Sequence, residues 1–256
     1  MKVFLSGLES SEDNIIKEYL KKGIKIDYAL TSFFYCRKKK TFIDNLKRFS
    51  KEILVDSGAH SFQKGKKVDW VEYTKEYAEW ILKNDNEQIL GYFEMDVDNI
   101  IGYNNVLELR KILESVTDKI IPVWHKNRGV EDFKKMCRDY QGKIIAITGF
   151  RNEDIQDNQY IMFLKYAKRY NCKVHCLGMT RVKLLNHIPF DLVDSSTWKQ
   201  AGNYGEISRF KNGNLKREKH KGKFKTTDLD LINFEEFVSL QKYYKYKWKN
   251  VKWRSN

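Results

Sequence analysis

The stretch ILVDSGAHSF (residues 53–62) joins an apolar run to a polar turn. Ile53, Leu54 and Val55 are typical of a buried strand, and Asp56 follows them directly. Gly58 can adopt the backbone conformations that a sharp turn requires. The stretch therefore predicts a strand that delivers a carboxylate to a loop, a common way of building an active site.

Seven further apolar runs of similar length recur along the chain, and residues 70–84 and 157–170 between them have the apolar spacing of helices. Eight strands alternating with helices over about 200 residues predict a (β/α)8 barrel. A doubly wound open sheet would show the same alternation with fewer strands. The eight runs are KVFLSG (2–7), YALTSFFY (28–35), EILVDSG (52–58), QILGYFEMD (88–96), KIIPVWH (119–125), KIIAITGF (143–150), CKVHCLG (172–178) and FDLVDSS (190–196).

The net charge of +14 indicates a polyanionic partner, for which nucleic acid is the first candidate. Residues 198–256 hold 15 Lys and Arg against 6 Asp and Glu, which is +9 of the total. Cations alternate with aromatic rings in RFKNGNLKREKHKGKFK (209–225) and KYYKYKWKNVKWRSN (242–256). We therefore divide the chain into a catalytic barrel (1–200) and a basic extension that binds nucleic acid (201–256), although a solvated lysine-rich surface would look similar.

Cysteine spacing and hydropathy indicate a cytoplasmic chain. Cys36, Cys137, Cys172 and Cys176 lack the paired spacing of a zinc knuckle or of a disulfide framework, so we expect reduced thiols. The N-terminus turns acidic after a short apolar run, unlike a signal peptide, and no apolar run reaches membrane-spanning length. We expect no cofactor and no membrane partner.

Carboxylates close three of the predicted strands. Asp56, Asp96 and Asp194 would meet at one mouth of a barrel, because the carboxyl ends of its strands share one rim. One carboxylate can then attack carbon while the other moves protons. Other roles would also explain these carboxylates: Asp56 could cap the N-terminus of a helix, the DVDN segment with Asp98 could form an Asx turn, and the cluster could bind a metal. The same rim would carry Ser57, Gly58, His125, Gly149, Leu177 and Gly178, with glycines where a flat ligand could approach the backbone.

These strand ends resemble motifs of the tRNA-guanine transglycosylases. VDSGAHSF (55–62) is similar to their DSGGFQ motif, and FDLVDSSTW (190–198) to the VDMFDCVMPTR segment that carries the nucleophilic aspartate. YFEMDVDN (92–99), IPVWHK (121–126), AITGF (146–150) and HCLGMT (175–180) match further strand ends of the family in the same order. The resemblance covers roughly residues 52–205. Each match is short, and only the combination of all of them is specific.

The resemblance implies an exchange of bases, in which guanine leaves a nucleic-acid sugar and a free 7-deazaguanine base of the preQ0 type takes its place. Asp194 would attack the anomeric carbon and hold the sugar as an ester, while Asp56 would shuttle protons. Asp96 would read the Watson–Crick edge of the base. Around the base, Ser57, His125 and Gly149 would add hydrogen bonds, and Leu177 and His60 would bracket its faces. His175 lies inside a predicted strand, where a core histidine and a functional one are equally plausible, and we leave it out of the site.

The chain departs from the family in lacking its zinc cluster of three cysteines and a histidine, because no cysteine follows Cys176. We therefore expect no metal. In this it resembles the short, zinc-free DpdA-like transglycosylases of phages and bacteria, which act on DNA, so we expect DNA as the partner and, for a phage protein, the host cytoplasm as its location. The alternatives are a transglycosylase acting on tRNA, a non-catalytic nucleic-acid-binding barrel and a metal-dependent hydrolase.

Overall fold

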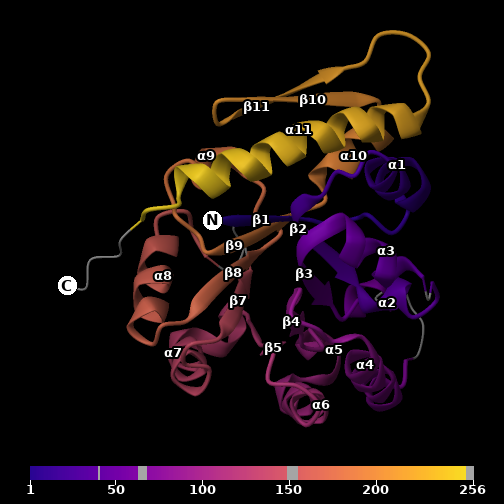
Figure 1. The fold of residues 1–256 in the computed structure, drawn as a ribbon. Coiled ribbons are helices and arrows are strands. Elements are labelled where there is room, and N and C mark those ends of the chain that lie inside the picture. The colour runs from indigo at the N-terminus through magenta and orange to yellow at the C-terminus, as the bar shows by residue number, and fades with distance from the viewer. Residues whose placement is uncertain (40, 63–67, 149–154, 252–256) are drawn as a thin grey trace.

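Nine strands form one parallel sheet in the computed structural model, which describes residues 1–39, 41–62, 68–148 and 155–251 (Figure 1). Neighbouring strands follow the order β5-β4-β3-β2-β1-β9-β8-β7-β6. The strands are β1 (Lys2–Leu5), β2 (Ile26–Ser32), β3 (Ser50–Asp56), β4 (Ile89–Phe93), β5 (Ile120–Ile121), β6 (Val123–Trp124), β7 (Ile144–Thr148), β8 (Lys173–Leu177) and β9 (Leu192–Ser195).

Pro122 divides one barrel strand into β5 and β6, because its nitrogen has no hydrogen to donate to the ladder. β5 pairs with β4 and β6 pairs with β7, so the two ends of the sheet meet at Pro122. All eight predicted runs contain a strand, and the predicted (β/α)8 barrel is confirmed. The second run is shorter than expected, because its last three residues, 33–35, belong to the short helix α2 (Phe33–Cys36), in which Phe33 and Cys36 are buried.

Alternate strand residues point into the barrel, as the period of a strand requires. His175 of β8 lies among them, with its ring 5.0 Å from the ring of Phe93 and 6.3 Å from that of Phe4. The opposite faces of the strands pack against the helices in a second, larger apolar cluster. The interior cluster consists of Phe4, Tyr28, Leu30, Leu54, Phe93, Ile121, Val123, Ala146 and Leu192.

Helices surround the barrel, and the helix predicted at residues 70–84 is confirmed as α4. Asp69 caps α4 by accepting hydrogen bonds from the backbone N–H groups of Val71 and Glu72. No helix within the described ranges is long and apolar enough to cross a membrane. The helices are α1 (Lys17–Lys21), α2 (Phe33–Cys36), α3 (Phe42–Phe49), α4 (Trp70–Asn84), α5 (Asp98–Ile101), α6 (Tyr103–Glu114), α7 (Gly129–Asp139), α8 (Tyr160–Arg169), α9 (Val182–Leu185), α10 (Thr197–Asn203) and α11 (Thr226–Lys247).

The C-terminal part of the chain contributes both to the barrel and to a separate ribbon (Figure 1). The long helix α11 packs against β1, β2 and α10 and buries Phe234, Phe237 and Leu240 there. Outside it lies an antiparallel hairpin of β10 (Glu206–Lys211) and β11 (Asn214–Lys219). The predicted boundary after residue 200 falls inside α10, and α11 forms part of the wall around the barrel.

One buried side chain fastens α11 to the sheet. The amide nitrogen of Gln241 donates to the carbonyl oxygens of Val3 (2.7 Å) and Tyr28 (2.8 Å), and its oxygen accepts from the backbone N–H of Asp27 (3.0 Å). Gln241 is fully buried, so these three backbone groups depend on it for hydrogen bonding.

We expect Gln241→Met, which keeps the volume and removes the amide, to lower the free energy of unfolding by about 3 kcal/mol, because it leaves buried polar groups unpaired. Urea unfolding followed by circular dichroism measures this change. Lys242→Met, at the exposed neighbouring position, is the matched control and should change the stability little. Equal effects of the two substitutions would show that the amide does not hold the helix.

Candidate active site

The carboxyl ends of the barrel strands surround a cavity of about 270 Å³. Asp56, the last residue of β3, and Asp194 in β9 both line it. The structure thus brings together the two carboxylates on which the sequence-based hypothesis depends. The other lining residues are Ser6, Gly7, Glu9, Leu30, Ser32, Tyr35, Ser61, Phe93 and Leu177.

Asp56 is held by the turn that follows β3. Its Oδ2 accepts a hydrogen bond from the backbone N–H of Gly58 at 2.9 Å. Gly58 has φ +76°, and a Cβ there would lie 2.4 Å from both Phe34 Cβ and Ser32 Oγ, so only glycine fits this turn. Burial raises the pKa of Asp56 to about 6, and the charges of Asp96 and Asp194 act in the same direction. Asp56 can therefore accept or release a proton near neutral pH.

Asp194 is held through one of its two oxygens. Its Oδ1 accepts from the backbone N–H of Gly178 (2.8 Å) and lies 3.0 Å from Nε2 of His175. Because a carboxylate oxygen only accepts, Nε2 of His175 carries the proton in this contact. Oδ2 has no hydrogen bond to any described residue, which leaves it available to attack a carbon atom in the cavity.

Sequence reasoning alone does not include His175 in the site. The ring is fully buried in the barrel, yet its Nε2 contacts the carboxylate of Asp194. The sequence signal was the two-residue period of β8, which turns His175 and Leu177 to the same side of the strand. His175 is therefore a positioning residue for Asp194.

Asp96 lies beside the cavity in a cluster with two histidines. Its Oδ1 is 2.7 Å from Nε2 of His125, and its Oδ2 is 3.5 Å from Nε2 of the exposed His60. Burial opposes ionisation of Asp96, but the hydrogen bonds and charges of His125 and His60 outweigh it and hold the pKa of Asp96 well below its usual range. Desolvation also opposes a charge on His125, and the pairing with Asp96 nevertheless raises the pKa of its ring. Asp96 is therefore an ionised hydrogen-bond acceptor.

Ligand atoms of Asp96, Asp98 and His125 lie within 4.8 Å of one another and could hold a metal ion. Asp98 is also paired with Arg128, whose Nη1 lies 3.7 Å from Asp98 Oδ2 and whose guanidinium stacks on the Tyr103 ring at 4.0 Å. A fixed cation at this position competes with a metal for the carboxylate of Asp98. The geometry therefore favours an ion-paired cluster over a metal centre.

A third carboxyl group in the cavity, Glu9, was missed. Its Oε1 accepts from Thr31 Oγ1 (2.9 Å) and from the backbone N–H of Ser32 (3.0 Å), and burial raises the pKa of its carboxyl. Glu9 lies four residues beyond the end of β1, so a search for polar residues directly at strand ends does not find it.

The remaining predicted residues divide into supporting and lining groups. Leu177 lines the cavity, and Gly178 supports Asp194 through its N–H. Ser57 is buried, its carbonyl oxygen accepts from the Tyr73 hydroxyl at 2.7 Å, and its own hydroxyl has no hydrogen bond to the described residues. Gly149 lies outside the described residues.

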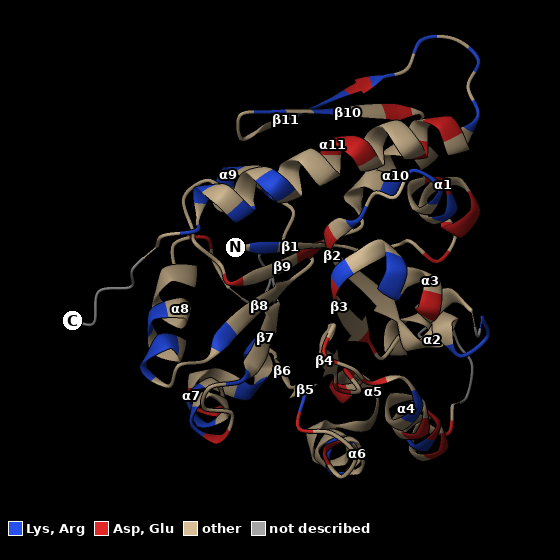
Figure 2. Ribbon diagram, in the orientation of Figure 1, with Lys and Arg blue, Asp and Glu red and all other residues tan. Residues whose placement is uncertain are grey.

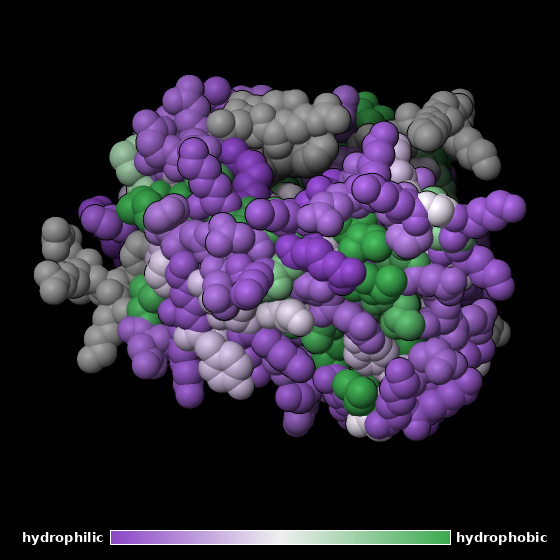
Figure 3. All heavy atoms as spheres, turned by 90° about the horizontal axis from the view of Figure 1, so that it is seen from above, coloured by the Kyte–Doolittle hydropathy of each residue, from purple (hydrophilic) through white to green (hydrophobic). Residues whose placement is uncertain are grey.

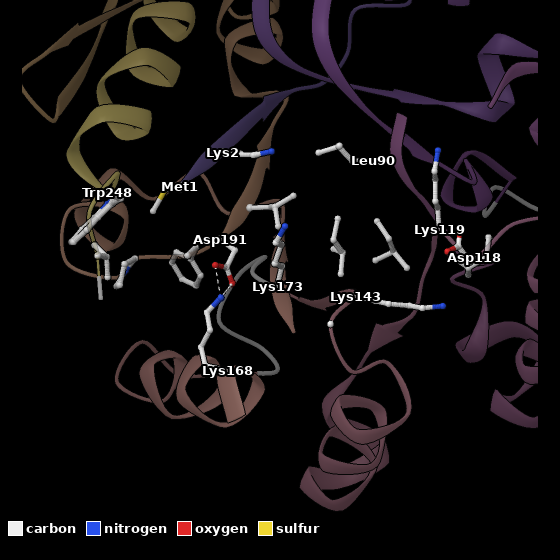
Figure 4. A pocket seen from close by; sticks show the side chains of 18 residues that line it. Met1, Lys2, Leu90, Asp118, Lys119, Lys143, Lys168, Lys173, Asp191 and Trp248 are labelled. Atoms are coloured by element: carbon white, nitrogen blue, oxygen red, sulfur yellow. Dashed lines mark hydrogen bonds and ion pairs between the residues drawn. The ribbon is translucent and has the colours of Figure 1, made fainter. Parts of the chain in front are cut away.

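A larger cavity, of about 560 Å³, opens at the opposite end of the barrel (Figure 4). Lysines project around it in Figure 4, and Lys168 forms an ion pair with Asp191 at 2.6 Å. It is lined by the first residues of several strands, including Lys2, Ile144 and Lys173. Because chemistry in parallel barrels sits at the carboxyl ends of the strands, the smaller cavity is the better candidate.

Comparisons with protein-family models, with curated proteins and with solved structures find no match to this chain. The structure itself defines the class, a parallel (β/α)8 barrel with paired carboxylates in a cavity at the carboxyl ends of its strands. Because one fold supports many activities, the function has to be argued from the site.

The pKa of Asp56 generates a prediction about stability. With a native pKa of about 6 and an ordinary unfolded value near 3.9, the native state holds a proton that the unfolded state has lost between about pH 4 and pH 6. Above about pH 6, the ionised carboxylate of Asp56 therefore destabilises the native state. Below about pH 4, where Asp56 is protonated in both states, this destabilisation is absent. We expect Asp56→Asn to raise the free energy of unfolding by about 2 kcal/mol at pH 8 and to change it little at pH 4.

Urea unfolding of wild type and Asp56→Asn at the two pH values measures this difference. Asp13→Asn, at an exposed carboxyl whose side chain is 87% accessible, is the control for removal of one negative charge. If the free energies of unfolding of Asp56→Asn and wild type differed by the same amount at pH 4 and pH 8, the pKa of Asp56 would not be raised.

Proposed function

We propose that this protein is a glycosyltransferase that exchanges guanine in DNA for a free 7-deazaguanine base of the preQ0 type. The observation that carries the proposal is the shared cavity of Asp56 and Asp194. The two carboxyls have different surroundings, as a nucleophile and a proton shuttle require. The resemblance of their strand ends to transglycosylase motifs supplies the type of reaction.

In the proposed first step, Asp194 Oδ2 attacks the anomeric carbon of the sugar. A C–O bond forms as the bond from this carbon to N9 of guanine breaks, and Asp56 donates a proton to the leaving base. In the second step, Asp56 takes the N9 proton of the incoming 7-deazaguanine, and N9 displaces Asp194 from the sugar. Asp56 returns to its protonated form, and no redox step is needed.

The base would lie over the strands that carry Asp96, His125 and Leu177. Asp96 is an acceptor for the N–H groups on the Watson–Crick edge of guanine. Of its two oxygens, Oδ2 is held less closely and would be the one to accept from a base, because its contact with the exposed His60 is 3.5 Å long, whereas His125 lies 2.7 Å from Oδ1. Ser57 and Gly58 approach from the turn after β3, and Gly149 is proposed from the resemblance alone.

The base must leave the stacked helix before Asp194 can reach its sugar, because the glycosidic bond of a paired nucleotide is covered. A cationic protein surface has to hold the backbone in the meantime, and the net charge of +14 supports this requirement. The polymer is DNA in this proposal, and tRNA is the alternative that the assay has to include.

We expect Asp194→Ala to reduce base exchange by about 10³-fold or more, because the covalent intermediate cannot form. The assay follows labelled guanine or 7-deazaguanine into duplex DNA and, in parallel, into tRNA, with mass spectrometry of the nucleosides. Asp13→Ala, at an exposed carboxyl that does not line the cavity, is the matched control.

Full exchange by Asp194→Ala would contradict the proposal, and incorporation into tRNA alone would replace DNA by RNA as the polymer. Binding without exchange in the wild type would favour a non-catalytic barrel. Activity that a chelator abolishes and added metal restores would favour a metal centre at Asp96, Asp98 and His125.

The contact between His175 and Asp194 predicts that two substitutions of His175 lower kcat to different degrees. His175→Gln keeps an N–H donor at the end of the side chain, whereas His175→Leu removes it. We expect the Leu variant to lose about tenfold to a hundredfold in kcat with an unchanged KM for the free base, and the Gln variant to recover much of this loss. Equal kcat values for two variants of equal thermal stability would show that His175 only fills space.

A further inference from the structure

The hairpin outside α11 and the loop that follows it form an exposed cationic surface, which we call the cationic ribbon (residues 206–225). It contains eight Lys and Arg and two Glu, which is a net charge of +6. Figure 2 shows these cations along β11 and the loop beyond it. Seen from the side of the ribbon, the surface of the described residues is largely hydrophilic (Figure 3).

The protein does little to neutralise this charge. Arg209 pairs with Glu236, and Arg217 with Glu206, but six lysines of the ribbon are exposed and have no ion-pair partner among the described residues. Arg209 also lies directly opposite Lys216 in the hairpin, and like charges in that position repel each other. The six lysines are Lys211, Lys216, Lys219, Lys221, Lys223 and Lys225.

The backbone of the ribbon is fixed although its charged side chains are exposed. Asn233 of α11 accepts from the N–H of Ser208 (2.6 Å) and donates to the carbonyl of Glu206 (2.9 Å), and Glu236 accepts from the N–H of Phe210 (2.8 Å). At the hairpin turn, Asn186 donates to the carbonyl of Gly213 at 2.8 Å. A surface held in this way loses little conformational entropy when it binds.

The ribbon begins close to the candidate active site. α10 follows β9, which carries Asp194, and a Cβ on the cavity residue Gly7 would lie 3.8 Å from Lys199 Cβ of α10. At a helical rise of about 1.5 Å per residue, α10 adds only about 10 Å between the cavity and the start of β10. One DNA molecule, with a helical turn of about 34 Å, is long enough to reach both.

The chemistry of the ribbon favours a duplex over a single strand. Surfaces that bind single strands stack bases on aromatic rings along their path. Two exposed rings, Tyr204 just before the ribbon and Phe224 near its end, lie together at its base beside Gly205, and the hairpin strands themselves present cations to solvent. A six-residue strand is about 20 Å long, and a two-stranded ribbon fits the major groove of DNA.

We propose that the cationic ribbon (206–225) is a docking surface for the phosphate backbone of duplex DNA. The choice of DNA rests on the proposed function, whereas the binding itself needs no catalysis. The ribbon holds the duplex through sequence-independent phosphate contacts while the target base enters the cavity. The apolar face of α11 takes no part, because it is buried against the barrel.

The test compares two variants of equal charge. In the ribbon variant, Lys216, Lys219, Lys221 and Lys223 are changed to Gln. In the control variant, Lys75, Lys83, Lys111 and Lys135, which are exposed on α4, α6 and α7, are changed to Gln. Each variant removes four charges, from +14 to +10. Fluorescence anisotropy with a 20-base-pair DNA duplex and, in parallel, with a DNA single strand and an RNA of the same length, from 50 to 300 mM salt and without free base, gives the affinity and its salt dependence.

We expect the slope of log K against log salt to decrease by about 3 to 4 in the ribbon variant, since each phosphate contact contributes about 0.9. The affinity at low salt should fall at least tenfold below that of the control variant. Equal slopes in the two variants overturn the proposal, and so does a loss confined to single strands or to RNA. Unchanged melting temperatures would show that both variants remain folded.

The binding result is separable from the proposed function. If wild type exchanges bases in DNA but the ribbon variant binds duplex like the control, the docking surface is wrong and the function stands. If the ribbon variant loses duplex binding and wild type shows no exchange, the docking surface stands and the function is wrong.

Discussion

A closed barrel of parallel strands brings the carboxyl ends of all its strands to one rim, and the candidate site depends on this constraint. Leu54 and Leu192 point into the barrel, so Asp56 and Asp194, two residues further along the same strands, face the same side at its mouth. Only β1 and β2 lie between β9 and β3 in the sheet. A shift of one residue in the register of β3 would turn Asp56 towards the helices and separate the pair.

The three aspartates at this rim share one chemistry, and their different surroundings give them different capacities. Asp56 accepts one backbone N–H in a buried turn, so burial dominates and its pKa rises to about 6. Burial also opposes ionisation of Asp96, but two histidines outweigh it and keep the pKa of this carboxyl low. Asp194 keeps one oxygen free of described partners while His175 and Gly178 orient the other. In the proposed reaction, these differences would assign proton transfer to Asp56, hydrogen-bond acceptance to Asp96 and nucleophilic attack to Asp194.

Much of the fold and part of the site could be predicted from the sequence. Apolar runs with polar ends locate the strands, and the rule that strand ends meet locates Asp56 and Asp194. His175 was missed because its neighbours make it look like core, and only coordinates show a ring inside the barrel that contacts a carboxylate at the rim. Glu9 was missed because a loop carries it back over β2, a path with no local sequence signal. The role of α11 depends on long-range packing, which charge and composition do not reveal.

The polar side chains of α11 connect the barrel to the ribbon, so the C-terminal part of the chain is not an independent tail. Gln241 bonds to β1 and β2, while Asn233 and Glu236 bond to β10. Gln241 and Asn233 are both fully buried. Without the strands that they bond to, their amide groups would therefore lose these hydrogen bonds and would have no water to replace them. The same helix therefore covers the barrel at β1 and β2 and holds the backbone of the ribbon in place, which ties the proposed chemistry and the proposed docking of DNA to one packing arrangement.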